Sequence, residues 1–210
     1  MLNYFRRKRL DATQVLHQAI GARTPPSFPA ATMQTLKLLR SPDATFPEIG
    51  RSIEANPGLL VRILQMINSA AFGLRRRVAD IGLAASLLGR SRLESLVVAA
   101  AVRSELPEPQ ADGFCRHRFW KAAARRASLA RGLADILHPQ TASQSFVSGL
   151  LLDMAVPMVA DARPKEYGPL LEHWHHDSDA SLEALEASEF GWTHATVGAS
   201  LATRWTLGDT

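Results

Sequence analysis

Helix start signals recur along this chain, and most are followed by apolar residues at helical spacing. Asn56 precedes Pro57, an arrangement typical of a helix N-terminus, because the asparagine caps the first turn and proline fits its first position. Leu60, Ile63 and Ile67 then fall on one face, as in a core helix. No segment alternates apolar and polar residues between turn signals as a half-buried strand would. The sequence therefore predicts an all-α fold.

Further caps and stops divide the rest of the chain. Thr45 with Glu48 and Ser91 with Glu94 have capping-box spacing, and Gly89 is suited to a helix stop. The predicted helices begin near residues 27, 45, 56, 78 and 91, and continue with 114–137, 143–154, 182–189 and 194–205. Segments 106–113 and 172–179 are predicted to be loops, the first between two closely packed helical lobes.

The helical spacing also predicts the residues of the core. They are Leu36, Leu39, Ile53, Leu60, Ile63, Leu64, Ile67, Ile81, Leu88, Leu96, Val97, Trp120, Leu133, Leu150 and Leu151. With 210 residues and 46% hydrophobic composition, the chain can bury a core of this size as a single domain, 1–210.

The sequence indicates a soluble cytoplasmic protein. Its single cysteine, Cys115, excludes an internal disulfide framework and suits a reducing compartment. The basic start of the chain lacks the apolar segment of a secretion signal, and we expect no apolar run of about 18 residues and no membrane association.

Charge is unevenly placed along the chain. Residues 1–132 carry 21 Lys and Arg against 9 Asp and Glu, whereas residues 133–210 carry 3 against 11. A basic half can bind nucleic acid, and Arg6–Arg9 with Arg75–Arg77 would be the contacts. The runs lack interleaved aromatic residues that stack on bases, so solvated helix faces are the favoured interpretation.

Two blocks of residues resemble the HDOD family, helical domains related to the HD metal-dependent phosphohydrolases and found mostly in bacterial signalling proteins. The first block comprises Asn56, Pro57, Leu59, Asn68, Ser69, Phe72 and Gly89. The second comprises Trp120, Gly149, His194, Gly198 and Trp205. The resemblance implies an HD-like multi-helix bundle, and related domains usually continue for several helices beyond the equivalent of Trp205.

The resemblance places Leu152 and Asp153 where an active HD enzyme carries its His-Asp pair. Leucine offers no lone pair to a metal, and the family's upstream histidine falls near Ala122. We therefore expect no catalytic residues, no metal and no cofactor, with Asp153 acting as a cap or a buried hydrogen-bond partner. His194 is expected to make a structural hydrogen bond at a helix start.

The remaining potential ligands cluster in the predicted loop at residues 172–179. They are His173, His175, His176, Asp177 and Asp179. Their spacing in a loop imposes no coordination geometry, so an adventitious surface cluster is the favoured interpretation.

These observations lead to a non-catalytic regulatory module for signal transduction, acting through a signalling protein partner or a small ligand. Two alternatives stay open: a residual metal-dependent phosphohydrolase acting on a nucleotide or cyclic dinucleotide, and nucleic-acid binding through the basic half. A homo-oligomer and a shortened form lacking C-terminal helices also remain open.

Overall fold

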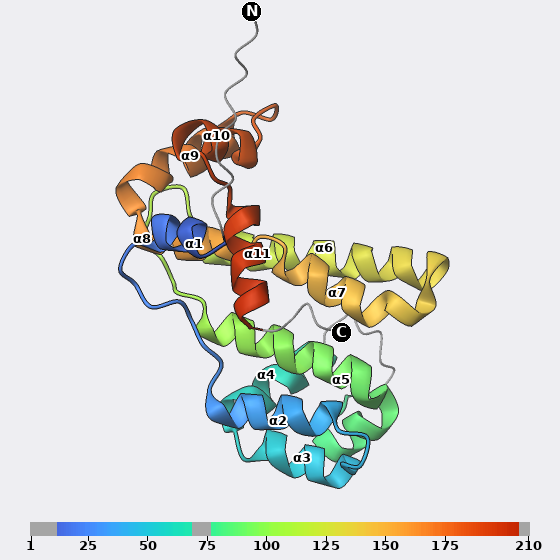
Figure 1. Ribbon diagram of the computed structural model, residues 1–210. Helices are drawn as coiled ribbons and strands as arrows, with labels where there is room; N and C mark the ends of the chain where they lie inside the picture. Colours follow the sequence, from blue (N-terminus) through green and yellow to red (C-terminus); the bar gives the residue numbers. More distant parts are fainter. Residues whose placement is uncertain (1–11, 69–76, 206–210) are drawn as a thin grey trace, which may run out of the picture. The chain divides into compact units, whose positions relative to one another are not determined.

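The structure, a computed structural model, describes residues 12–68 and 77–205, and all regular secondary structure within these ranges is helical (Figure 1). The all-α prediction is confirmed. The chain forms two compact units, each made from separate stretches of sequence. The first unit comprises residues 1–25, 107–115 and 153–210, and the second comprises residues 26–106 and 116–152.

The second unit is organised around one long helix, α5, which contacts α2, α3, α4 and α7. Its elements are α2 (Ala30–Arg40), α3 (Phe46–Glu54), α4 (Pro57–Ile67), α5 (Ile81–Glu105), α6 (Arg116–Leu137), η2 (Pro139–Thr141) and α7 (Ala142–Leu151). Leu93, Leu96 and Val97 of α5 are fully buried, as are Ile53 of α3 and Ile63 of α4. Burial of large aliphatic side chains on both sides of each contact is the main source of stability here.

Gly89 interrupts α5, as the sequence predicted. Its backbone has a φ of 74°, which L side chains rarely adopt, so the two halves of the helix meet at a kink. The guanidinium of the next residue, Arg90, donates hydrogen bonds to the backbone carbonyls of Ser41 (2.6 Å) and Ala44. The kink thus directs Arg90 onto the connection between α2 and α3.

Local capping signals set several helix starts as expected. Thr45 and Glu48 form the predicted capping box at α3, and the Asn56 side chain accepts a hydrogen bond from the backbone N–H of Leu59 at 3.1 Å. Glu94 does not follow this pattern: its carboxylate accepts a hydrogen bond from Arg40 Nε at 2.6 Å.

Helices α6 and α7 pack through small residues. Ala123, Ala127 and Ala134 of α6 are buried, and a Cβ on Gly149 of α7 would lie 3.0 Å from the Cα of Ala127. Glycine is therefore required for this close approach. Leu133 was predicted to be in the core, and this is wrong, because α6 turns its alanine face to α7 and leaves Leu133 largely exposed.

The other core predictions divide by degree of burial. Leu36, Leu39, Ile53, Ile63, Ile67, Ile81, Leu96, Val97, Leu150 and Leu151 are buried. Leu60, Leu64, Leu88 and Trp120 are only partly buried. Helical spacing therefore identified the buried faces, but not which residues at the margins of a face remain accessible.

Asn68 connects the end of α4 to the backbone ten residues further on. Its amide nitrogen donates to the carbonyls of Leu64 and Val78, both at 2.7 Å, and its amide oxygen accepts from the N–H of Val78 at 2.8 Å. The side chain thereby pairs with both polar groups of the Val78 backbone. Ser69 and Phe72, from the same sequence block, lie outside the described residues.

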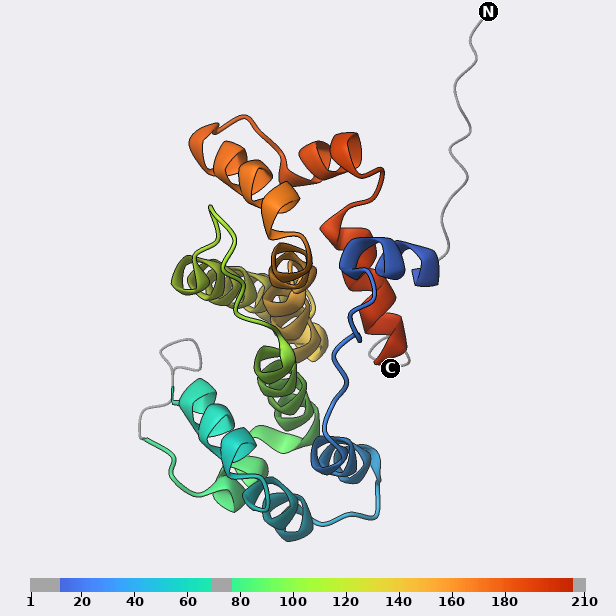
Figure 2. The same cartoon turned by 90° about the vertical axis from the view of Figure 1, so that its left-hand side faces the viewer.

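The first unit packs helix α11 against α1 and α8 (Figure 2). Its elements are α1 (Ala12–Ile20), α8 (Ala155–Ala162), α9 (Pro164–His176), α10 (Leu182–Glu189) and α11 (His194–Arg204). Val197 and Leu201 of α11 are fully buried, and Gly198 and Trp205 are buried beside them. Arg163 ties the end of α1 to this unit by donating from Nε to the carbonyl of Ala19 at 3.1 Å.

Three helices, α1, α8 and α9, were not predicted. The expected loop at residues 172–179 is wrong in its first part, since residues 172–176 form the end of α9. Gly168 and Pro169 within this helix obscure its pattern, but Tyr167 and Leu171, four residues apart, are both buried. Packing of that face stabilises the helix despite the proline. The loop at residues 106–113 contains no helix, as predicted.

One helical stretch, Pro139–Ala162, is long and apolar enough to cross a membrane by length and composition, with a mean hydropathy of 1.4. The expectation that no such run occurs is wrong by this measure. However, 56% of its most apolar window is buried inside the structure, and core helices of soluble proteins pass the same test. The stretch is therefore weak evidence for a membrane span.

The Asn68 contacts generate a prediction about stability. Asn68→Leu should lower the free energy of unfolding by about 1–3 kcal/mol, because leucine cannot pair with the N–H and C=O of Val78. Gln65→Leu, at an exposed position of the same helix, is the control and should stay within about 0.5 kcal/mol of wild type. Urea unfolding measures both, and equal effects in the two variants would contradict a structural role for Asn68.

Candidate functional site

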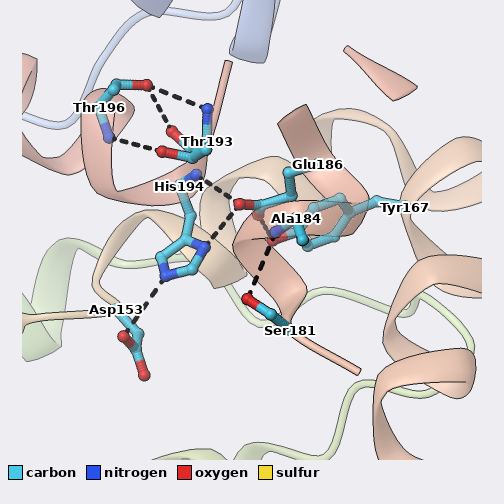
Figure 3. Close-up of polar contacts among 8 residues, drawn as sticks. All are labelled: Asp153, Tyr167, Ser181, Ala184, Glu186, Thr193, His194 and Thr196. Atoms are coloured by element: carbon cyan, nitrogen blue, oxygen red, sulfur yellow. Dashed lines mark hydrogen bonds and ion pairs between the residues drawn. The ribbon is translucent and has the colours of Figure 1, made fainter. Parts of the chain in front are cut away.

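The two residues at the position of the HD pair differ in exposure: one side chain is exposed and the other is partly buried. Leu152 follows the last residue of α7 and is 59% exposed. Asp153, which begins the next stretch of the first unit, is partly buried, and its carboxylate faces His194 (Figure 3). The site that can be described chemically therefore starts from Asp153.

His194 lies between two carboxylates. Its Nδ1 is 2.7 Å from Glu186 Oε2, and its Nε2 is 3.6 Å from Asp153 Oδ1. Burial, the largest single influence, favours the neutral ring, but the hydrogen bonds and charges of Asp153 and Glu186 together outweigh it and raise the pKa of His194 to about 9. The imidazole is therefore a cation at neutral pH, with both nitrogens protonated.

Glu186 is fully buried and accepts three hydrogen bonds. Its Oε2 accepts from the backbone N–H of His194 at 2.8 Å as well as from the ring, and its Oε1 accepts from the hydroxyl of Tyr167. Burial, followed by the charge of Glu186, raises the pKa of Tyr167 well above its usual range, so the phenol stays neutral and donates. A buried carboxylate is tolerated when it is paired and hydrogen-bonded in this way.

Two helix starts and an aromatic stack place these groups. Ser181 caps α10, and Thr193 forms a capping box with Thr196, so His194 becomes the first residue of α11. Between them, Gly191 has a φ of 78°, and Phe190 stacks on Trp192 with ring centroids 4.7 Å apart. The backbone N–H of His194 is one that the first turn of α11 leaves without an intrahelical partner, and Glu186 satisfies it.

The expected hydrogen bond of His194 is thus present. Asp153 was expected to act as a cap or a buried hydrogen-bond partner, and its partly buried carboxylate instead lies 3.6 Å from His194 Nε2 as an ion pair. Glu186 and Tyr167 were missed. A signal for Glu186 does exist in the sequence: it lies four residues after buried Leu182, which places a carboxylate on the apolar face of α10.

The histidine cluster lies at the C-terminal end of α9, where each ring contacts its own helix or the residue after it. His175 Nδ1 is 2.6 Å from the Leu171 carbonyl, and His176 Nδ1 is 2.8 Å from that of Glu172. His173 Nε2 lies 3.8 Å from Asp177. Among the residues that the structure describes, no group of three or more His, Cys, Asp or Glu side chains is arranged to hold a metal ion.

The basic segments considered for nucleic acid lie largely outside the described residues, which include only Arg77, an exposed side chain. Elsewhere in the second unit, the guanidinium of Arg103 lies 5.1 Å from the ring centroid of Trp120. Burial and the nearby charges of Arg116 and Arg62 lower the pKa of Arg103. Trp120 therefore packs beneath a guanidinium.

The contacts of Glu186 predict a large contribution to stability. Glu186→Leu should lower the free energy of unfolding by about 3–5 kcal/mol, because it removes the partner of a buried cation and leaves the Tyr167 hydroxyl without its acceptor. Glu183→Leu changes an exposed residue of the same helix and should be close to neutral. Thermal and urea unfolding of both variants test this, and a small loss for Glu186→Leu would refute it.

The raised pKa of His194 predicts a pH dependence. An unfolded histidine has a pKa near 6.5, so the stabilisation should be complete below about pH 6.5 and be lost as the pH rises through about 9. The difference in unfolding free energy between wild type and His194→Gln should shrink by up to about 3 kcal/mol over that window. The exposed His117→Gln is the control. A difference that stays constant with pH would contradict the ion-paired state.

Solved structures of similar fold include three proteins that are longer than this chain. An HDOD domain protein of unknown function from Geobacter sulfurreducens is 22% identical, with a TM-score of 0.73 over 95% of this chain and 67% of its own. A protein described as a candidate phosphohydrolase from Shewanella amazonensis SB2B is 25% identical, with a TM-score of 0.71 over 86% and 63%. A candidate signal transduction protein from Marinobacter aquaeolei VT8 is 20% identical, with a TM-score of 0.75 over 94% and 48%.

Comparison of sequences finds a relative and a matching family model. An uncharacterized protein from Treponema pallidum (strain Nichols) is 26% identical over 183 residues, which cover 87% of this chain but 35% of that protein. The chain thus spans about a third of the length of this relative. The family model described as the HDOD domain matches residues 26–210, most of the sequence and both units. This chain belongs to the HDOD domain family.

Proposed function

We propose that this chain is a non-catalytic regulatory module that acts in the cytoplasm by binding a signalling protein. The observation that carries the proposal is the geometry of His194, whose two ring nitrogens each face a carboxylate, Glu186 Oε2 at 2.7 Å and Asp153 Oδ1 at 3.6 Å. A protonated imidazole has no lone pair for a metal ion. The charged groups near the HD position therefore stabilise the fold in place of catalysis.

The residues present do not fit the metal of an HD phosphohydrolase. Leu152 stands at the histidine of the pair, and Ala122, near the family's upstream histidine, is an exposed alanine. Neither side chain has a donor atom. Asp153 alone cannot hold a metal and also activate water, because metal-dependent hydrolysis needs several ligands that fix the coordination geometry.

Two further observations support the proposal, one for the regulatory role and one for the cytoplasmic location. One protein of similar fold is described as a candidate signal transduction protein, and another is an HDOD domain protein without a known function. The chain has a single cysteine, Cys115, and so cannot form an internal disulfide, which suits a reducing cytoplasm.

The catalytic part of the proposal is tested with metals and phosphate esters. We expect calorimetric titrations with manganese, nickel and iron to show no micromolar binding that depends on Asp153, and assays with an aryl phosphate ester and a phosphodiester to show no turnover. Asp153→Ala and a triple variant of His173, His175 and His176 distinguish the two places where a metal could bind. Turnover above a boiled control that is lost in Asp153→Ala would replace the regulatory function with an enzymatic one.

The binding part is tested by affinity purification of the tagged chain from its native cells, followed by calorimetry with the purified candidate partner. We expect one signalling protein to be enriched over an unrelated all-helical bait and to bind at a fixed stoichiometry. Absence of enrichment, or salt-sensitive recovery of nucleic acid alone, would contradict the proposal.

A further inference from the structure

One face of α6 presents a continuous row of large aliphatic side chains to solvent. Leu129, Leu133, Ile136 and Leu137 recur at intervals of four, three and one residues, which places them on one side of a helix. They are 60–80% exposed. Single exposed aliphatic residues are common, but a contiguous group on two turns of one helix is typical of an interaction surface. We call these four residues the α6 aliphatic face.

The packing of α6 within its unit explains why this face stays open. Helix α7 lies beside α6 (Figure 1) and packs on a different side of it, where Ala127 approaches the backbone of Gly149. The contact between these helices therefore uses the small residues of α6. Beside Leu133, a side chain added at Gly132 would meet nothing within 4 Å, so the exposed surface also has space for an incoming side chain.

We propose that the α6 aliphatic face binds the same face of a second copy of this chain, with the two α6 helices antiparallel. A twofold axis beside Leu133 would place Leu133 next to its own equivalent and Leu129 opposite Leu137 of the second copy, because both lie four residues from the axis. The face is therefore complementary to itself, as a twofold interface requires. Large aliphatic side chains on the facing sides are what paired helices use for contact.

The charges along α6 favour antiparallel over parallel pairing with a second copy. The exposed residues Arg118, Lys121 and Arg125 occupy the N-terminal half of α6, and the last turn of α6 carries no basic residue. Antiparallel pairing places Arg125 beyond the C-terminal end of the other α6, where the helix dipole is negative. The two Arg125 side chains would then be about 24 Å apart along the axis, well beyond the screening length of about 8 Å. Parallel pairing would instead place the basic halves side by side.

An anionic membrane is the main competing occupant, since it also binds aliphatic and basic residues. Helices that lie on membranes usually carry basic residues along the polar flanks of their apolar stripe. In α6 the exposed basic residues Arg118, Lys121 and Arg125 precede the aliphatic face along the helix, and Arg131, which lies within its span, is paired with Asp135. The arrangement therefore fits an antiparallel helix better than a lipid surface.

The first test is the mass of the 210-residue chain in solution. Sedimentation velocity over a concentration series should show a reversible change to twice the monomer mass. Leu133→Glu should abolish it, because two carboxylates would meet at the twofold axis. Its circular dichroism should remain as in wild type, and its melting temperature should match that of wild type at concentrations where wild type is monomeric. Val61→Glu, an exposed aliphatic position on α4, is the matched control and should still dimerise. A monomeric wild type, or a dimer unaffected by Leu133→Glu, overturns the proposal.

A cross-linking experiment tests the symmetry. In a Cys115→Ala background, Leu133→Cys should form a disulfide between two copies when oxidised glutathione accepts the two electrons and two protons, whereas Val61→Cys should not. Phosphatidylserine vesicles provide the last arm. Binding of a monomeric chain to vesicles that Leu133→Glu removes would assign the face to a membrane, and equal cross-linking at Val61 and Leu133 would refute the twofold contact.

Discussion

The buried carboxylate of Glu186 is the constraint on which the first unit depends. It connects α9, α10 and α11 through Tyr167, its own helix and His194, and His194 extends the network to Asp153 before α8. A buried charge is costly unless every acceptor site is used, so these helices must be in register for the network to exist. The network thus favours one arrangement of these helices over alternatives that would leave the charge unpaired.

Local signals predicted much of this unit, and non-local packing accounts for what they missed. The limits of α10 matched the expected range, and α11 began as expected, because caps and the glycine stop act within a few residues. Helix α9 was missed because Gly168 and Pro169 interrupt its pattern, whereas burial of Tyr167 and Leu171 maintains it. Sequence propensity is weaker than tertiary packing in such a segment.

Helix α6 shows a second limit of periodicity. Its sequence contains two faces at helical spacing, one of alanines and one of large aliphatic residues, and hydrophobicity alone favours burying the larger. The structure buries the alanines, because Gly149 allows α7 to approach only a face without bulky side chains. The prediction that Leu133 is buried was therefore wrong because the more hydrophobic face of α6 is the exposed one. That face remains available for a partner. The candidate site shows the same limit of sequence reasoning. The family resemblance identified His194, but not the buried carboxylate of Glu186 that raises its pKa.

A regulatory module and an enzyme require different properties of their residues. An enzyme needs a neutral ligand histidine whose lone pair points into an open site, whereas a binding module needs a stable scaffold and an accessible surface. Under the proposed regulatory function, the cationic His194 serves the scaffold, because the attraction between it and its two carboxylates stabilises the fold. The α6 aliphatic face belongs to the other unit and shares no residue with that network. Association and pH-dependent stability are therefore separable properties: a change at Leu133 should alter the first without the second, and a change at His194 the reverse.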